Sequence, residues 1–151
     1  MKAILTIIIF CAAGVGIFFL YTMSQNTQLL TTPLATQPIQ IGNAKLVVEI
    51  ANTEGLRTQG LSGRSSLQEG SGMLFVFEEE GEWGIWMKDM QFPIDIIFAG
   101  PDGVVGMIYH TVSPETYPEV FYPNQPARYV LEVPAGYAKK AGIVEGARIV
   151  L

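Results

Sequence analysis

The stretch WGIWMKDMQFPIDIIFAGPDG, residues 83–103, decides the fold because it combines two strand-like runs with a turn. Residues 83–88 and 94–99 are rich in aromatic and β-branched side chains, which favour strands. The sequence Pro101-Asp102-Gly103 is typical of a hairpin turn, since proline fixes φ and glycine accepts a positive φ. The stretch therefore predicts a core hairpin between its two runs, followed by a return strand over 104–109.

Working outward, we expect further strands on both sides of this hairpin, at 45–51, 72–77, 127–133 and 147–151. Thr53 is expected to cap a short helix interrupted by Gly55 and ended by Gly60, and a second short helix is expected at 137–142. The acidic run from Glu78 to Glu82 is expected to be a solvated loop. About seven short strands, one or two short helices and no crossover helix predict a mainly β fold: a single compact antiparallel β-sandwich or barrel-like domain.

The N-terminal region has a different composition. Residues 4–21 are uncharged and strongly apolar, and as a helix they would span about 27 Å. We therefore expect a transmembrane anchor within residues 1–21, a polar linker over 22–38, and the β domain over 39–151. Because Lys2 precedes the apolar run and the next cation is Lys45, the domain is expected outside the cytoplasm, periplasmic or extracellular. Secretion after signal cleavage is the alternative.

The composition narrows the chemistry. The net charge is −5 and no basic block exceeds the pair Lys139-Lys140, so a nucleic-acid partner is not expected. The only cysteine, Cys11, lies in the apolar run, and His110 is the only histidine. These counts leave the β domain without a disulfide, a thiol nucleophile or a zinc site built from Cys and His. We expect no metal and no cofactor.

Charged residues in otherwise apolar strands are the candidate site. Lys88 and Asp95 are expected to face each other across the predicted hairpin, with Trp86 on the face of Lys88. The set expected to bind a ligand is Arg57, Trp86, Lys88, Asp95, Arg128 and Glu132. The alternative is a structural network of buried ion pairs among these charges. Asp95 and Glu132 are also candidates for the acid and base of an enzyme.

The motifs resemble the DUF192 family over about residues 41–151. They comprise Arg57 with Gly60-Leu61, then Arg64, Gly72-Met73-Leu74-Phe75, Trp86-Met87-Lys88, Pro93-Ile94-Asp95-Ile96, and Ala127 through Gly136. The resemblance implies a compact β-rich domain, often exported, with no established activity. It also implies that the charged residues at motif positions are the stronger candidates for a functional role, namely Arg57, Lys88, Asp95, Arg128 and Glu132. Asp89, Met90 and Ser62 depart from the Asn, Thr and Met that the family favours there.

Three functions follow as expectations. The first is a membrane-anchored extracytoplasmic binding module for a polar small ligand, a glycan or an envelope protein, because no nucleophile motif is present. The second is a hydrolase or lyase that uses Asp95 or Glu132 as acid or base. The third is a structural interaction domain whose proline-rich stretch, residues 110–126, contacts a partner.

Overall fold

The computed structural model describes residues 5–8, 20–23 and 34–151, and divides the chain into two units at Pro33. In the first unit, strand β1 (Leu5–Ile8) pairs antiparallel with β2 (Leu20–Met23). The helix predicted across these two segments is wrong there, and the β-branched residues of the sequence LTII suit a strand. The remainder of the predicted anchor, and residues 24–33 of the predicted linker, lie outside the described residues. Within the described ranges, no helix has the length and apolar character needed to cross a membrane.

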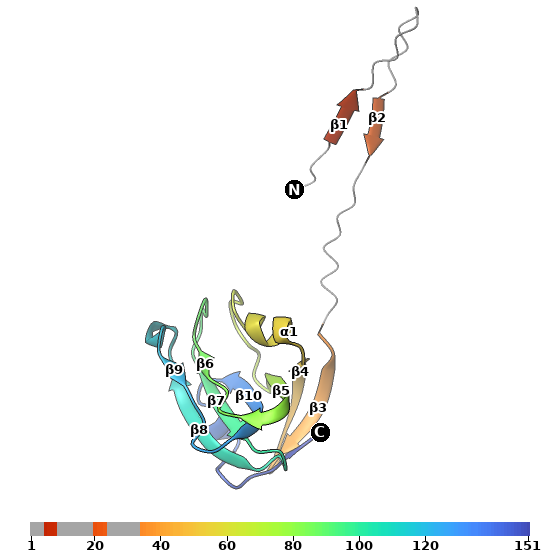
Figure 1. Ribbon diagram of the computed structural model, residues 1–151. Helices are drawn as coiled ribbons and strands as arrows, with labels where there is room; N and C mark the ends of the chain where they lie inside the picture. Colours follow the sequence, from red (N-terminus) through yellow and green to blue (C-terminus); the bar gives the residue numbers. More distant parts are fainter. Residues whose placement is uncertain (1–4, 9–19, 24–33) are drawn as a thin grey trace, which may run out of the picture. The chain divides into compact units, whose positions relative to one another are not determined.

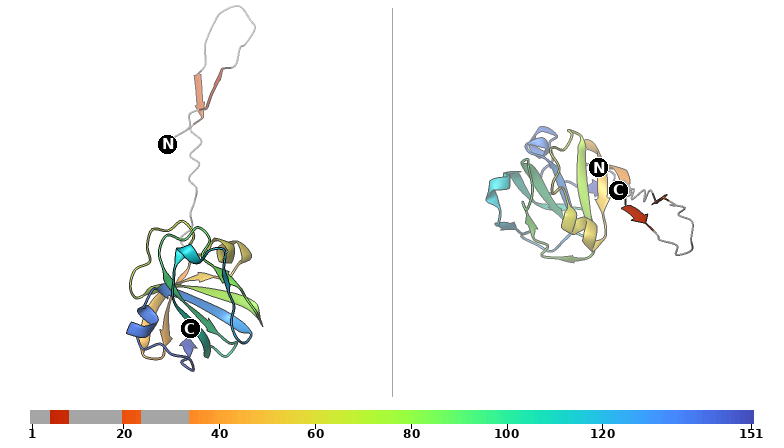
Figure 2. Two further views of the ribbon diagram at one scale, coloured as in Figure 1. Left: turned by 90° about the vertical axis from the view of Figure 1, so that its left-hand side faces the viewer. Right: turned by 90° about the horizontal axis from the view of Figure 1, so that it is seen from above.

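The second unit, Leu34–Leu151, is built on a curled sheet of seven strands (Figures 1 and 2). Across the sheet the strand order is β11-β3-β4-β5-β10-β7-β8. Along the chain these strands are β3 (Thr36–Ile41), β4 (Ala44–Ala51), β5 (Ser71–Gly81), β7 (Ile94–Ala99), β8 (Val105–Val112), β10 (Ala127–Pro134) and β11 (Ile149–Val150). The predicted mainly β fold is confirmed, although β3 begins at Thr36, inside the predicted linker.

The curl brings the two edges of the sheet together at one point, which makes it a half-barrel joined at one end. Val104 forms an antiparallel bridge with Arg148, and the backbone N–H of Ile149 donates to the carbonyl of Gly103 at 2.9 Å. Gly103 has a φ of +80°, and a Cβ there would lie 2.7 Å from the carbonyl oxygen of Ile149. A glycine is therefore required at the predicted hairpin turn for both its backbone conformation and the close approach of β11.

The pairing of β4 with β5 corrects the expectation of a purely antiparallel sheet. These strands run parallel, with Val47 opposite Ser71, and helix α1 (Glu54–Gln59) lies in the connection between them. The predicted cap is confirmed, because the Thr53 hydroxyl accepts a hydrogen bond from the backbone N–H of Leu56. A single turn and a half of helix is too short for a periodic pattern, so the sequence did not indicate a crossover.

The predicted hairpin between residues 83–88 and 94–99 is wrong. Only β6 (Ile85–Trp86) forms in the first run, and it pairs with β9 (Val120–Phe121) in a separate two-stranded sheet. Strand β7 instead lies between β10 and β8, and all six of its residues are buried. The longer strands β10 and β8 pair with β7 on both sides, whereas the run 83–88 is followed by a left-handed residue, Asp89, with a φ of 57°. The hairpin from β7 to β8 is confirmed.

The loop predicted for the acidic run is wrong in part, because Glu78, Glu79 and Glu80 belong to strand β5. The pairing of Gly81 with Ala127 on β10 carries this strand beyond the core, where its side chains are exposed. Backbone pairing with a long neighbour therefore outweighs the low strand propensity of glutamate.

Two apolar clusters cover the two faces of the central strands. Leu74, Ile97 and Leu131 lie in one cluster, and Phe75, Phe98 and Val130 lie in the other. Helix α2 (Tyr137–Lys140) contributes Ala138 to the first cluster. The second cluster also contains Leu61 of the segment after α1 and Ile85 of β6. In both Figure 1 and Figure 2, α1 and the short 3-10 helix η1 (Pro114–Thr116) lie at the same end of the domain.

Candidate ligand-binding site

The candidate site is an open groove between α1 and β6, with a small pocket at its inner side. The groove, which we call the α1–β6 groove, has a volume of about 530 Å³ and is lined by Glu54, Gly55, Thr58, Gln59, Ser62, Trp86, Lys88 and Asp89. The pocket, which we call the Glu132 pocket, has a volume of about 60 Å³ and includes Arg57, Leu61, Phe75, Ile85, Met90 and Glu132. Thr58, Gln59, Ser62 and Trp86 line both spaces, so the two form one site.

Hydrogen bonds hold the two walls of this site together. The Ser62 hydroxyl donates to the carbonyl of Lys88 at 2.9 Å, and the N–H of Gly63 donates to the carbonyl of Asp89 at 2.8 Å. The Gln59 amide donates to the carbonyl of Ser62 at 3.2 Å. The segment after α1 is thus tied to the segment after β6, which gives the groove a fixed shape before any ligand binds.

Glu132 is the unusual residue of the site. It lies on β10 opposite Met73 and Ile96, on the face of the second apolar cluster, and only 5% of it is exposed. Its Oε2 atom is buried and has no hydrogen-bond partner among the described residues. Desolvation by burial raises the pKa of Glu132 to about 8, and the charge of Arg64 opposes that rise. The carboxyl group is therefore largely protonated at neutral pH and can donate or accept a hydrogen bond.

Glycine at position 72 allows β5 and β10 to approach each other beside Glu132. A Cβ at Gly72 would lie 2.7 Å from the carbonyl oxygen of Glu132. Any larger residue would push the two strands apart at the point where the buried carboxyl group is placed.

Arg64 lies near this carboxyl group but is committed elsewhere. Its guanidinium forms a bidentate pair with Glu49 on β4, at 2.5 Å and 2.7 Å. This hydrogen bonding lowers the pKa of Glu49 and raises that of Arg64. Arg64 is one of the motif positions, but the sequence contains no signal for its partner, because β4 and the segment after α1 meet only in the folded domain.

The other side chains of the site combine positive charge with aromatic rings. The Arg57 guanidinium lies 4.9 Å from the centroid of the Phe77 ring and donates one hydrogen bond, to the carbonyl of Val76 at 3.0 Å. Trp86 is 49% exposed, and the Lys88 ammonium lies 5.8 Å from its ring centroid. Tyr117, which follows η1, meets Trp86 edge-on with ring centroids 6.1 Å apart. The groove thus presents an exposed aromatic surface next to a cation.

Asp95 has a different position from the one expected. It lies opposite Val133, on the face of the first cluster, and is fully buried. Its carboxylate accepts hydrogen bonds from the backbone N–H groups of Thr111 at 2.8 Å, Gly136 at 3.0 Å and Ala138 at 2.9 Å. Asp95 therefore fastens β8 and the start of α2 to β7, and it faces away from the Glu132 pocket.

The structure brings together some of the predicted residues and separates others. Arg57, Trp86 and Glu132 line the Glu132 pocket, and Lys88 lies in the adjoining groove. Arg128 lies outside both spaces, where its Nε donates to the carbonyl of Phe77 at 3.3 Å. The expected ion-pair network is wrong, because the salt bridges in the described part of the chain join Arg64 to Glu49, Lys140 to Glu69 and Arg148 to Asp102.

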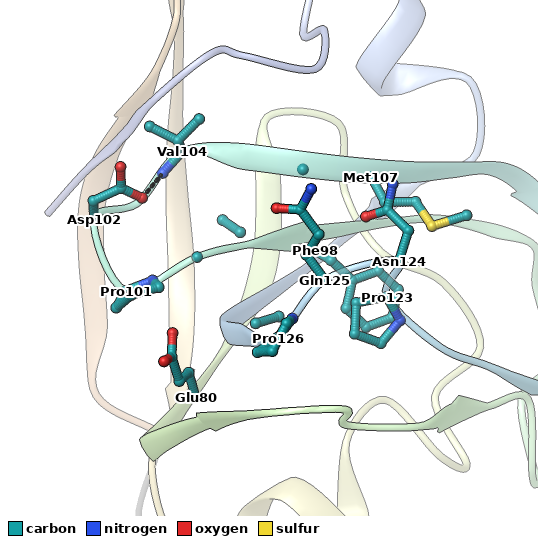
Figure 3. A pocket seen from close by; sticks show the side chains of 14 residues that line it. Glu80, Phe98, Pro101, Asp102, Val104, Met107, Pro123, Asn124, Gln125 and Pro126 are labelled. Atoms are coloured by element: carbon teal, nitrogen blue, oxygen red, sulfur yellow. Dashed lines mark hydrogen bonds between the residues drawn. The ribbon is translucent and has the colours of Figure 1, made fainter.

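A second cavity of about 460 Å³ opens beside the β7–β8 turn (Figure 3). It is lined by Glu80, Asp102, Met107 and the segment from Pro123 to Pro126, whose amide side chains at Asn124 and Gln125 face the strands. The carboxylates of Glu80 and Asp102 in this cavity are exposed. The buried polar atom that lacks a hydrogen-bond partner in the described residues, Oε2 of Glu132, does not line it. No group of three metal-binding side chains occurs in the ranges that the structure describes.

The family model for DUF192, described as "Uncharacterized ACR", matches residues 37–151. A protein from Sinorhizobium meliloti 1021, provisionally described as a transcription regulator, has a similar crystal structure with 31% identity and a TM-score of 0.74. The match covers 78% of this chain and 94% of that one. A protein of unknown function from Novosphingobium aromaticivorans DSM 12444 has 27% identity and a TM-score of 0.75, over 80% of this chain and 89% of that one. The comparison with curated proteins found no match.

Proposed function

The chain belongs to the DUF192 family, and from the geometry of its site we propose that its domain is a binding module for a polar small ligand or glycan. The ligand occupies the α1–β6 groove and places one polar group in the Glu132 pocket. The observation that carries the proposal is Glu132, which lines the pocket and whose buried Oε2 has no hydrogen-bond partner among the described residues. A buried polar atom without a partner costs about 1–3 kcal/mol, so a ligand group that satisfies it gains affinity.

The electrostatics of the site favour binding over acid–base catalysis by a pair of carboxyl groups. Asp95 and Glu132 lie on opposite faces of the sheet, and Asp95 is saturated by backbone N–H groups. A mechanism with an acid and a base needs both groups at one reacting centre. The second candidate is a hydrolase or lyase, and one observation favours it. Burial raises the pKa of Glu132 to about 8, and a carboxyl group with such a pKa can act as a general acid at neutral pH.

We further propose that the domain is held at a membrane on its extracytoplasmic side. The support is the apolar, uncharged composition of residues 4–21 and the position of Lys2 before them. Release after cleavage of this segment is the alternative. The ligand would then be a component of the cell envelope or of the surrounding medium. The net charge of −5 argues against nucleic acid as the ligand, despite the description of the Sinorhizobium protein.

The proposal is tested by ligand screening on the full chain with a panel of glycans and small polar compounds, using thermal shift and then calorimetry. Trp86→Ala and Glu132→Leu should each weaken binding by at least about tenfold, which corresponds to the loss of one buried contact or stacking surface. Val144→Ala, at an exposed residue outside the groove, is the control and should leave binding unchanged.

Ligands that bind the wild type and both groove variants with equal affinity would exclude this site. Turnover of a bound compound that Glu132→Leu abolishes would favour the enzyme instead. A panel without any binder would favour an interaction domain, for which the stretch 110–126 is the expected contact.

A further inference from the structure

Building on the proposed binding function, we infer that the groove recognises acidic sugars of the uronic acid class. The carboxylate of the sugar enters the Glu132 pocket, and the sugar ring lies in the α1–β6 groove against Trp86. The volumes, the charges and the aromatic rings of the site each support this assignment.

The two volumes set which part of a ligand goes where. The Glu132 pocket, at about 60 Å³, holds a group of two or three heavy atoms, since one water occupies roughly 30 Å³. A sugar ring does not fit there, but a carboxylate does. The outer groove, at about 530 Å³, is in the range of about 300–1,000 Å³ that is typical of sites for small molecules. A ring with one small polar substituent matches this division.

The charges of the pocket favour an anionic group over a cationic one. Arg57 and Glu132 are the only ionisable residues that line it. A guanidinium has five N–H donors; that of Arg57 packs over the Phe77 ring and uses one donor for the carbonyl of Val76, while the positive charge that acts on Glu132 itself is that of Arg64. The buried carboxyl group of Glu132 is protonated at neutral pH, so its hydroxyl can donate to a carboxylate oxygen. An ammonium group would find no carboxylate partner in the pocket while Glu132 is protonated.

The outer groove suits the remainder of the sugar. Trp86 offers an exposed ring, with Tyr117 set edge-on beside it, and a flat aromatic surface can pack against the apolar face of a pyranose. Lys88 lies above the same indole. Glu54 and Asp89, on the rim, can accept hydrogen bonds from sugar hydroxyls.

The test is calorimetry on the full chain with glucuronate and galacturonate, their short oligomers, the neutral sugars glucose and galactose, and glucosamine as the cationic analogue. Uronates should bind at least about tenfold more tightly than the neutral sugars, because charge-assisted hydrogen bonds are the strong ones. Binding of the oligomers in preference to the monomers would identify a polysaccharide as the source of the sugar.

Variants separate this inference from the binding function on which it rests. Glu132→Gln keeps a neutral donor and should lose no more than about threefold in uronate affinity, whereas Glu132→Leu should lose at least about tenfold. Arg57→Met should also lose about tenfold and Arg57→Lys less, with Arg148→Met, at an exposed arginine elsewhere, as the control.

Two outcomes overturn the inference while leaving the groove as a binding site. One is equal affinity for uronates and neutral sugars, and the other is tight binding of glucosamine that Glu132→Gln abolishes. If no member of this sugar panel binds, the inference fails, and the broader panel of polar compounds decides the proposed function. If Trp86→Ala and Glu132→Leu leave all binding unchanged, the proposed function fails as well.

Discussion

Replacing Glu132 with glutamine should remove a large part of the pH dependence of stability. Burial raises the pKa of this carboxyl group from 4.5 to about 8 in the folded domain. Between these two values the folded state holds a proton that the unfolded state has released, so the free energy of unfolding of the wild type falls as the pH rises. The contribution is fully present below pH 4.5 and is lost as the pH rises through about 8.

The magnitude follows from the size of the shift, since each pKa unit corresponds to about 1.4 kcal/mol. By pH 7 the wild type should have lost about 3 kcal/mol relative to pH 4.5, and above pH 8 about 5 kcal/mol. For a domain whose total stability is about 5–15 kcal/mol, this is a large effect. Glutamine has nearly the same shape as the protonated acid and stays neutral, so Glu132→Gln should match the wild type near pH 4.5 and exceed it increasingly at higher pH.

Urea denaturation of both full-length chains from pH 4.5 to 9, followed by the fluorescence of Trp83 and Trp86, measures this difference. Glu145→Gln, at an exposed glutamate, is the matched control and should follow the wild-type curve. Effects of other titrating groups are shared by the chains and cancel in the comparison. Wild-type and Glu132→Gln curves that stay parallel over the whole range would refute the assignment of a protonated, buried Glu132.

Three further predictions concern stability. Asp95→Asn should lower the free energy of unfolding by about 3 kcal/mol, because an amide cannot accept hydrogen bonds from all three backbone N–H groups that the carboxylate accepts. Adding Lys88→Met to this variant should change the free energy of unfolding little, since no ion pair joins Lys88 to Asp95. Chemical denaturation of the single and double variants checks both expectations. Gly103→Ala should lower the melting temperature, because the positive φ and the 2.7 Å contact with a carbonyl of β11 together cost about 1–3 kcal/mol. An unchanged melting temperature would contradict the closure of the sheet edges at this point. Glu49→Gln should destabilise the domain at neutral pH, because the pair with Arg64 holds the pKa of Glu49 low in the folded state. The stabilisation that this pair contributes to the wild type is lost as the pH falls through the folded-state pKa of Glu49, so the difference in stability between variant and wild type should shrink in acid. A difference that stays constant with pH would argue against the pair.

The core hairpin shows how far local patterns reach. The turn at Pro101-Asp102-Gly103 and the strands on both sides of it follow from residues close together in the sequence, and both are confirmed. The partner of the preceding run, residues 83–88, cannot be predicted from nearby residues. Strand β6 pairs with β9, more than 30 residues away, because β7 already has longer neighbours on both edges. Competition between distant strands has no local signature in the sequence.

The site residues divide in the same way. Alternation along a strand predicts that Asp95 shares a face with Ile97 and Ala99, and these two residues do lie in the first cluster, on the face of Asp95. It could not show that Glu132 lies on the opposite face of the sheet, because that depends on the register between β7 and β10. The joint lining of one pocket by Arg57, Trp86 and Glu132 likewise depends on how α1 and β6 pack over the sheet.

The sequence by itself determined the family, the mainly β class, the cap of α1, the β7–β8 turn and the list of unusual charges, because each depends on residue identity or short spacing. Only the tertiary structure decided what those charges do. It saturates Asp95 with backbone N–H groups, pairs Arg64 with Glu49, and leaves Glu132 buried without a partner for one oxygen. Burial and hydrogen bonding are properties of the assembled fold, so the same residue type becomes a structural fastening on one face of the sheet and a candidate binding group on the other.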